Sequence, residues 1–220
     1  MLPENKPKKK DVTPRVFFIW GDAMSGKTYL ARQFPDPILL NTDGNYIKVD
    51  TPSVYITDYK QLLLTLKELE EQQGKVFKTI IIDLVEDVRR MISKQVCTKY
   101  NEETLGENKK IRGTDWVVDK TMWYDFIHYT THLINYNIVF TCHVMDDTDP
   151  IDGTKQIVPM LKKKDLDVLE GRCDFSIRTS KLGSKYIARI TSKRNGLTKD
   201  DVKDEKIKKI LNYVGGIENE

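Results

Sequence analysis

Eight consecutive residues near the start of the chain have the types and spacing of a phosphate-binding loop. The segment GDAMSGKT fits the pattern G-x-x-x-x-G-K-[ST] and directly follows the apolar run VFFIW. In such a loop, glycines let backbone N–H groups point at a polyphosphate. The lysine reaches the β- and γ-phosphates, and the threonine hydroxyl binds Mg²⁺. An ordinary strand–turn–helix junction is the alternative. The pattern predicts a nucleoside triphosphate site made of Gly21, Asp22, Ala23, Met24, Ser25, Gly26, Lys27 and Thr28.

Two carboxylates follow other predicted strands. Asp83 ends the apolar run TIIID, where it can hold Mg²⁺ together with Thr28, directly or through water; a helix N-cap is the alternative. Leu84 comes next, so a carboxylate that orients the attacking water must come from elsewhere. Asp43, after the run ILLNT, is the catalytic candidate. Its alternative role is a turn, because Asp-Gly is common turn chemistry.

Two further polar residues close later strands. His143 follows the apolar run NIVFTC, where it can sense the γ-phosphate and signal to the next loop; a satisfied strand-end histidine is the alternative. Arg194 lies in the segment KRNG after the last predicted strand. Arginine suits bidentate phosphate recognition, so Arg194 is a candidate arginine finger for a neighbouring subunit's nucleotide. A plain surface cation is the alternative.

A histidine pair on a predicted helix has the spacing of some metal sites. His128 and His132 are four residues apart, but Tyr129 occupies the position of the glutamate in H-E-x-x-H, and no third ligand is evident. The sequence therefore does not favour a zinc site here.

The elements that position these residues alternate along the chain. Apolar runs predict strands at residues 15–20, 38–40, 54–56, 76–82, 137–142 and 156–158, and a hairpin at 175–179 and 186–191. Helices are expected at 28–34, 59–73 with Asp58 as N-cap, 84–100 and 116–135, with loops at 101–113 and 146–153. This order predicts an α/β fold: a mainly parallel sheet with helices on both faces and a C-terminal antiparallel hairpin. Ligands of such sheets bind at the carboxyl ends of the strands.

Bulk properties predict one globular domain. The 220 residues are 39% hydrophobic, and no apolar run is long enough to span a bilayer. The N-terminus lacks the apolar stretch of a secretory signal, and the three cysteines are odd in number and far apart, which fits a cytoplasmic protein. We expect a disordered basic tail at 1–14, the ATPase core at 15–197 and a charged helix or tail at 198–220.

Charge points only weakly to a partner. The net charge is +3, but lysines cluster at residues 8–10, 109–110, 162–164 and 206–209. Such clusters can attract a nucleic-acid backbone, or they can be an ordinary solvated surface.

The blocks GDAMSGKT, LLNTDGN, TIIID, VFTCH and KRNG together resemble the RecA-like ATPases over residues 15–197. The closest resemblance is to the small phage proteins of the Sak type, which are single-strand annealing and recombination factors. The resemblance implies a RecA-like P-loop NTPase core that uses ATP and Mg²⁺. It also implies Asp43 as the catalytic carboxylate, where most members carry Glu, and His143 as the coupling residue, where recombinases usually have Gln. Arg194 matches an arginine that acts across the subunit boundary in related hexameric helicases, although Ser192 replaces the lysine two residues before it.

The partners implied by the resemblance are single-stranded DNA, further copies of the chain and a single-strand binding protein. The segment after His143 is acidic, so residues 156–164, with three consecutive lysines, are the better candidate for DNA contact. They contain no aromatic residue, so the base-stacking residues are left unassigned.

Three functions remain open. The first is a DNA-stimulated ATPase that promotes annealing or strand exchange. The second is a nucleotide-gated DNA-binding module or helicase loader with negligible turnover. The third is a small-molecule kinase, for which the chain lacks an arginine-rich lid.

Overall fold

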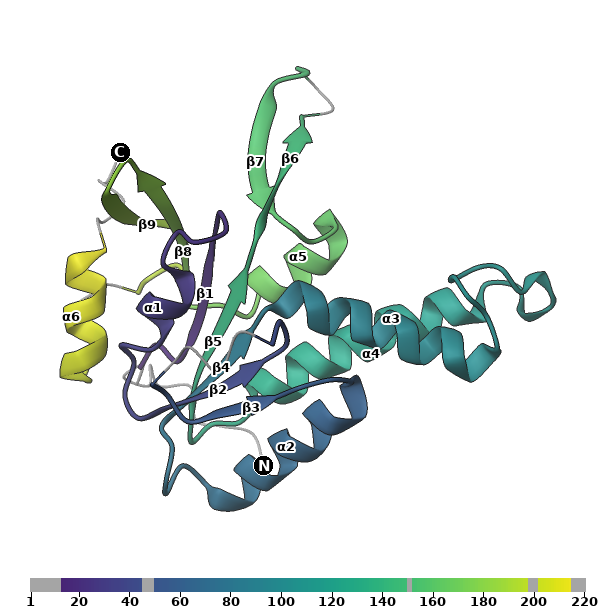
Figure 1. The fold of residues 1–220 in the computed structure, drawn as a ribbon, viewed down its shortest axis with the longest axis horizontal. Coiled ribbons are helices and arrows are strands. Elements are labelled where there is room, and N and C mark those ends of the chain that lie inside the picture. The colour runs from purple at the N-terminus through teal and green to yellow at the C-terminus, as the bar shows by residue number, and fades with distance from the viewer. Residues whose placement is uncertain (1–12, 45–49, 150–151, 198–201, 215–220) are drawn as a thin grey trace, which may run out of the picture.

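The computed structural model describes residues 13–44, 50–149, 152–197 and 202–214. The predicted basic tail therefore lies outside the described residues except for positions 13 and 14, as do residues 198–201 and 215–220 of the predicted C-terminal segment. Helices on both sides of one large sheet form the body of the molecule, and a hairpin and a helical pair project from it (Figure 1).

The large sheet has seven strands in the order β3-β2-β4-β5-β1-β8-β9. Neighbouring strands run parallel except for the last pair, β8 and β9, which is antiparallel. Because β1 lies between β5 and β8, and β5 lies between β4 and β1, the carboxyl ends of β1, β4 and β5 meet at one edge. The strands are β1 (Val16–Gly21), β2 (Pro37–Asn41), β3 (Ser53–Tyr55), β4 (Thr79–Asp83), β5 (Asn137–Cys142), β8 (Phe175–Leu182) and β9 (Lys185–Lys193).

The helices cover both faces of this sheet. They are α1 (Lys27–Ala31), α2 (Tyr59–Gln72), α3 (Val85–Tyr100), α4 (Thr114–Thr131), α5 (Lys163–Glu170) and α6 (Glu205–Tyr213), and residues Lys109–Ile111 form a 3₁₀ turn. One buried cluster joins α2, α3 and α4 to the face that carries Phe18 and Phe140. A second joins α1 and α6 to the opposite face, with Phe17 and Val139. The predicted fold class is confirmed.

Strand β1 shows why the sequence predicts a buried sheet. All six of its residues are buried, and successive side chains point to opposite faces, so Phe17 and Phe18 enter different clusters. A strand buried on both faces needs an unbroken apolar run, which is the pattern of the sequence. Helix α2 was equally readable: the Asp58 side chain accepts a hydrogen bond from the Gln61 backbone N–H at 2.9 Å, as an N-cap does.

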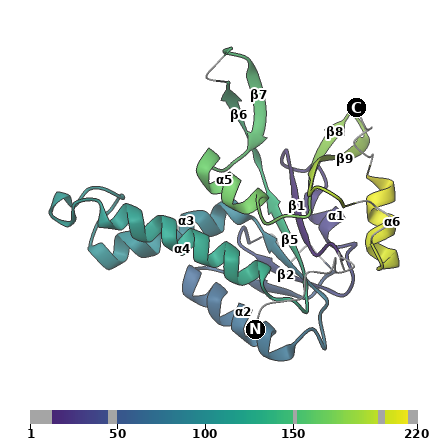
Figure 2. The same ribbon diagram turned by 180° about the vertical axis from the view of Figure 1, so that it is seen from behind.

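The segment after β5 differs from the sequence prediction. Residues 146–148 are part of strand β6 (Val144–Thr148), not of a loop, and β6 pairs with β7 (Lys155–Pro159). The predicted strand at 156–158 is therefore correct, but it belongs to a separate two-stranded sheet rather than to the main one. The hairpin projects from the carboxyl edge of the sheet (Figures 1 and 2). Most side chains of the hairpin are exposed, so the sequence of β6 lacks the alternation of apolar and polar residues that a strand with one buried face shows.

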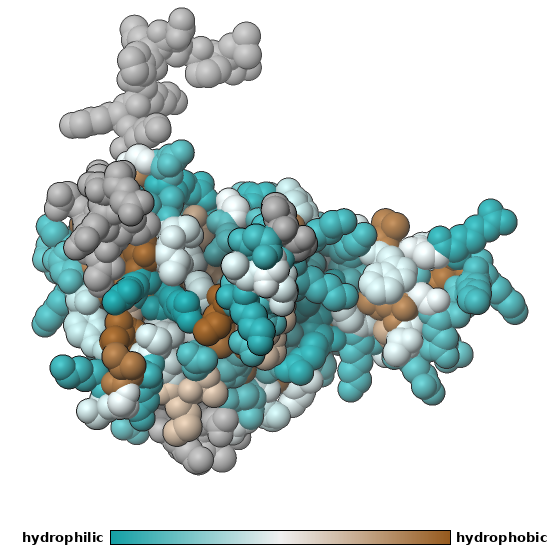
Figure 3. Space-filling model, turned by 90° about the horizontal axis from the view of Figure 1, so that it is seen from above, coloured by the Kyte–Doolittle hydropathy of each residue, from teal (hydrophilic) through white to brown (hydrophobic). Residues whose placement is uncertain are grey.

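Helices α3 and α4 pack side by side and extend beyond the sheet as an arm (Figures 1 and 2). Seen from the side of the hairpin, the surface is mainly hydrophilic, with small separate groups of apolar side chains (Figure 3). Within the described ranges, no helix has both the length and the apolar character needed to cross a bilayer. The thiols of Cys97, Cys142 and Cys173 are buried and unlinked.

Candidate nucleotide-binding site

The loop between β1 and α1 has the backbone shape that the motif predicts. Gly26 has a φ of +90° at the N-terminus of α1, a conformation that favours glycine. Gly21 has no room for a side chain: a Cβ there would lie 2.1 Å from the Thr179 carbonyl oxygen on β8. Ser25 also contacts this strand, through a 2.7 Å hydrogen bond between its hydroxyl and that of Thr179. Strand β8 therefore packs against the loop and holds it in place.

Lys27 lies inside this loop. Its Nζ donates hydrogen bonds to the carbonyl oxygens of Gly21 at 3.0 Å and Asp22 at 2.8 Å, and the residue is buried. Burial lowers the pKa of Lys27, and the nearby Glu86 and Asp83 carboxylates oppose that effect. A buried ammonium held by carbonyl oxygens can exchange them for phosphate oxygens, which bind it more strongly.

Thr28 and Asp83 come together as predicted for a metal site. The Thr28 hydroxyl lies 3.3 and 3.2 Å from the two carboxylate oxygens of Asp83, and the Thr141 hydroxyl on β5 also donates to Asp83. Burial raises the pKa of Asp83, and the Asp43 carboxylate nearby adds to the rise. A buried carboxylate and a hydroxyl are oxygen ligands of the kind that Mg²⁺ prefers, and the cation would offset the cost of burying the charge. These residues fit a Mg²⁺–triphosphate complex.

The two remaining candidates near the loop also line this cleft. Asp43 follows β2, and its Oδ1 accepts a 2.8 Å hydrogen bond from the Asn41 side chain. His143 follows β5 at the same edge. The structure therefore brings Lys27, Thr28, Asp83, Asp43 and His143 to one cleft, although their roles in chemistry remain predictions.

One residue at this site was missed by the sequence reasoning. Glu86, in the first turn of α3, is buried and accepts hydrogen bonds from both the backbone N–H and the Nδ1 of His143, each at 2.9 Å. Burial raises its pKa, but the hydrogen bonds from His143 outweigh this and hold the pKa below its usual value. In the sequence, the only signal for Glu86 is that it is an acid three residues after Asp83; Leu84, with no polar group, stands directly after Asp83.

Arg194 lies away from this cleft. Its Nε is 3.3 Å from Asp174, and Asp174 in turn accepts hydrogen bonds from the backbone N–H groups of Arg15 and Val16 at the start of β1. The phosphate-binding loop follows the other end of that strand, so Arg194 is at the opposite end of the sheet and does not reach the loop of its own chain. Its role across a subunit boundary remains a prediction.

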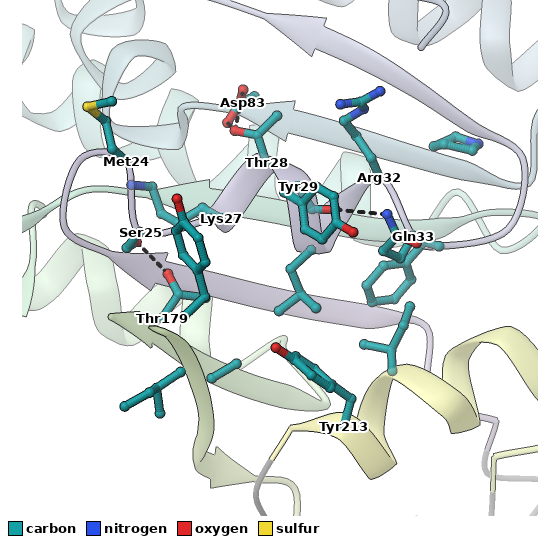
Figure 4. A pocket seen from close by; sticks show the side chains of 18 of the residues that line it. Met24, Ser25, Lys27, Thr28, Tyr29, Arg32, Gln33, Asp83, Thr179 and Tyr213 are labelled. Atoms are coloured by element: carbon teal, nitrogen blue, oxygen red, sulfur yellow. Dashed lines mark hydrogen bonds between the residues drawn. The ribbon is translucent and has the colours of Figure 1, made fainter. Parts of the chain in front are cut away.

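The cleft continues beyond the loop toward α6 and has a volume of about 1380 Å³. Tyr29, Tyr186 and Tyr213 line it, from α1, β9 and α6 respectively. The three tyrosines are largely exposed, and Tyr186 packs against the loop at Gly26. Figure 4 shows Lys27, Thr28 and Asp83 on one side of this space and Tyr213 on the other. The cleft has room for the rest of a nucleotide as well as its phosphates.

The histidine pair of α4 is not part of the cleft. The rings of His128 and His132 are 4.0 Å apart, and the Tyr124 ring stacks on His128. Among the residues the structure describes, no group of three or more His, Cys, Asp or Glu residues is placed to hold a metal ion. These rings instead lie in a row on the helix surface.

The sheet is mainly parallel, the phosphate-binding loop follows β1, and the Asp83 carboxylate at the end of β4 lies next to Thr28 of that loop. These features together define a RecA-like P-loop ATPase domain. The sequence profile of an AAA domain family matches residues 13–201, and the chain belongs to that family. No curated protein matches the chain. Among solved structures, it is similar to the flagellar accessory protein FlaH from Methanocaldococcus jannaschii, with 11% identity, 83% of this chain and 80% of that chain covered, and a TM-score of 0.45.

Proposed function

We propose that this protein hydrolyses ATP and uses the nucleotide cycle to bind single-stranded DNA and promote annealing or strand exchange, as phage recombination proteins of the Sak type do. The observation that supports it most is the contact between Glu86 and His143. The Glu86 charge acts on Lys27 of the phosphate-binding loop, and His143, which lines the nucleotide cleft, directly precedes the projecting strand β6. A change at the phosphates thus has a short route to the hairpin.

The chain's own residues have separable roles in this proposal. Lys27 and the loop N–H groups hold the phosphates, and Thr28 and Asp83 hold Mg²⁺, which neutralises phosphate charge when bound. Asp43 accepts a proton from, or orients, the attacking water. His143 keeps its contact with Glu86 or releases it, and so gives the hairpin two positions.

The first test is ATP turnover in Lys27→Ala. We expect turnover to fall at least about a hundredfold, because the variant loses a charge that contacts the transferring phosphoryl group. Phosphate release with Mg²⁺ measures it, and Lys60→Ala on α2, an exposed lysine outside the cleft, is the control. Equal turnover in wild type and Lys27→Ala would reject the ATPase proposal. Stimulation of the wild type by oligo-dT is expected, and its absence would reject the DNA part alone.

A nucleotide-gated module without turnover is the second candidate. It is favoured by Leu84 directly after Asp83 and by the short Asp43 side chain, which is already hydrogen-bonded to Asn41. In this case ATP and a non-hydrolysable analogue would support DNA binding equally, while phosphate release would stay at background. Filter binding with ATP, with the analogue and without nucleotide distinguishes the two candidates. Transfer of phosphate to a nucleoside would instead indicate a kinase.

A further inference from the structure

A second cleft, of about 490 Å³, lies between α4 and α5 and shares no lining residue with the nucleotide cleft. Helix α5 sits between the base of the hairpin and the α3–α4 arm (Figures 1 and 2). The lining residues are unusual for a surface groove because flat aromatic rings and cations dominate it. They include Trp116, Lys120, Tyr124, Lys162, Lys163 and Lys164.

The aromatic rings come from α4. Trp116, Lys120 and Tyr124 are spaced by four residues, so each lies next to the following one on the helix surface. Trp116 is 39% exposed and Tyr124 is 49% exposed, whereas Trp123 between them is buried in the core. The Trp116 ring also carries a cation: Lys162 Nζ lies 5.6 Å from its centre. An exposed ring bordered by cations is suited to a planar group that carries negative charge.

The cations come mostly from α5 and the residue before it. Lys162, Lys163 and Lys164 are exposed. The two carboxylates in the lining, Asp119 and Asp165, are both ion-paired with Arg89. Lys163 also pairs with Asp167 at 2.5 Å, which leaves Lys162, Lys164 and Lys120 as the cations most available to a ligand. The groove is therefore positive at its rim, and at its base the single guanidinium of Arg89 pairs with both carboxylates.

We propose that this groove binds single-stranded DNA, with a base stacked on Trp116 and phosphates on the lysines. The inference rests on the proposed DNA-binding function and assigns it a surface. Stacking on protein rings needs unstacked bases, which a single strand offers and a duplex does not. An acidic protein would use the lysines but would gain nothing specific from the rings. Residues 156–164 lacked an aromatic partner in sequence, and folding supplies it from about forty residues earlier.

The groove is joined to the nucleotide site through the hairpin. Strand β7 ends at Pro159, two residues before the buried Leu161 that precedes Lys162. The Met160 backbone N–H donates a 2.8 Å hydrogen bond to the His143 carbonyl oxygen. His143, which contacts Glu86, is therefore hydrogen-bonded to a residue that stands two positions before the triple lysine, although His143 itself is far from it in sequence. Movement of His143 would be transmitted to the groove.

The first experiment removes the charge. Labelled oligo-dT binding, followed by fluorescence anisotropy, is compared between wild type, the triple variant Lys162→Ala, Lys163→Ala, Lys164→Ala, and the matched control Lys60→Ala, Lys67→Ala, Lys75→Ala. The control removes three exposed lysines from α2 and the turn after it. We expect the groove variant to bind at least about tenfold more weakly, and its salt slope to fall by about 2, given roughly 0.7 per phosphate contact on a single strand. The control should match wild type.

The second experiment follows the ring. Trp20 and Trp123 are 7% and 1% exposed, so a base that stacks on tryptophan in this chain reaches Trp116. Oligo-dT should quench the tryptophan emission of wild type, and Trp116→Phe should lose most of that quenching while keeping a ring against Gly106. Trp116→Leu should weaken binding about fivefold or more, since stacking contributes about 1–3 kcal/mol per base. Circular dichroism checks that both variants fold.

The outcomes separate the two levels of the proposal. If wild type binds no oligo-dT, the proposed DNA function fails. If wild type binds but the groove variants bind equally well and quenching is absent, DNA lies elsewhere and this inference is wrong. Equal binding of duplex and single strand would also overturn this inference. So would loss of binding in the triple-lysine variant together with full binding in Trp116→Leu, because a surface that binds an acidic protein depends on the lysines and not on the ring.

Discussion

At the scale of single residues, Asp83 combines a proposed role in Mg²⁺ binding with a cost in stability. Burial raises its pKa above the usual value of 3.8. For a carboxyl with a raised folded-state pKa, stability is greatest while it is protonated and declines as the pH rises through the folded pKa. The surroundings of Asp83 therefore disfavour its charged form in the nucleotide-free chain, and bound Mg²⁺ would reverse that effect.

Asp83→Asn should separate these two effects. Without nucleotide and Mg²⁺ at pH 7, we expect the variant to be more stable by about 1 kcal/mol, because it removes a buried charge at a functional site. Its Mg²⁺-dependent ATP turnover should be lost. Thermal unfolding and phosphate release measure the two effects, with Asp125→Asn, an exposed carboxylate on α4, as the control. A variant that is less stable than wild type would show that Asp83 is chiefly a structural hydrogen-bond acceptor.

A site residue could be predicted from the sequence when the residues that define its role are close to it in the sequence. Lys27 and Thr28 are fixed by an eight-residue pattern, and Asp83 by the strand that it ends, so their convergence could be predicted. Glu86 could not be assigned, because its importance comes from His143, which is 57 positions away. The proposed role of Trp116 could not be predicted for the same reason, since Lys162, whose ammonium lies over its ring, is 46 positions away in the sequence.

At the scale of elements, a buried ionic cluster holds three helices together. Arg89 on α3 donates to both carboxylate oxygens of Asp119 on α4 and, at 2.9 Å, to Asp165 on α5. Asp119 is 1% exposed, so its charge depends on this partner. The Arg89 side chain also lies 5.8 Å from the centre of the Trp123 ring. This cluster sets the distance between α4 and α5 and hence the width of the groove between them.

Arg89→Ala should destabilise the protein by about 3–5 kcal/mol, because it leaves a buried carboxylate uncompensated. Arg90→Ala is the matched control: its guanidinium is exposed and pairs with Asp87 one turn earlier, so its loss should cost less than about 1 kcal/mol. Urea unfolding of the two variants measures the difference. Similar urea midpoints for the two variants would mean that packing, and not the ion pairs, holds α3, α4 and α5 together.

Element prediction succeeded where burial imposed a pattern and failed where it did not. Strand β5 and helix α2 carry apolar residues at the spacing of their structure, and both were predicted within one residue. Helix α5 was not predicted: in its eight residues only two are buried, and one of these is Asp165. Strand β6 pairs with β7 in a hairpin whose side chains are mostly exposed, so its sequence carries acidic residues in place of an apolar pattern and resembles a turn.

At the scale of the whole molecule, the hairpin is a separate unit. Among the residues that the structure describes, its two strands pair with each other and with no strand of the main sheet. Replacing residues 146–157 with a short Gly-Ser linker should leave the stability nearly unchanged, within about 1 kcal/mol, because few buried contacts are removed. Basal ATP turnover should persist, and stimulation by oligo-dT should be lost.

Thermal unfolding and phosphate release with and without oligo-dT test this prediction. Exchange of Glu103 and Thr104, two exposed residues in the loop between α3 and α4, for Gly and Ser is the control and should retain DNA stimulation; α3 and α4 form the arm of Figure 1. Full stimulation without the hairpin would show that the signal leaves the nucleotide cleft by another route.

The edge strand β9 of the main sheet has a consequence for how copies of the chain can associate. Among the described residues, strand β9 is one edge of this sheet and β3 is the other; Lys185 and Arg189, four positions apart on β9 before its bulge at Thr191, are both exposed. Residues four apart in a strand lie on the same face, so a second β9 laid alongside would bring like charges together. This edge resists fusion of sheets into amyloid-like aggregates. In any ring or filament that the protein builds, pairing of one β9 edge with another is therefore disfavoured.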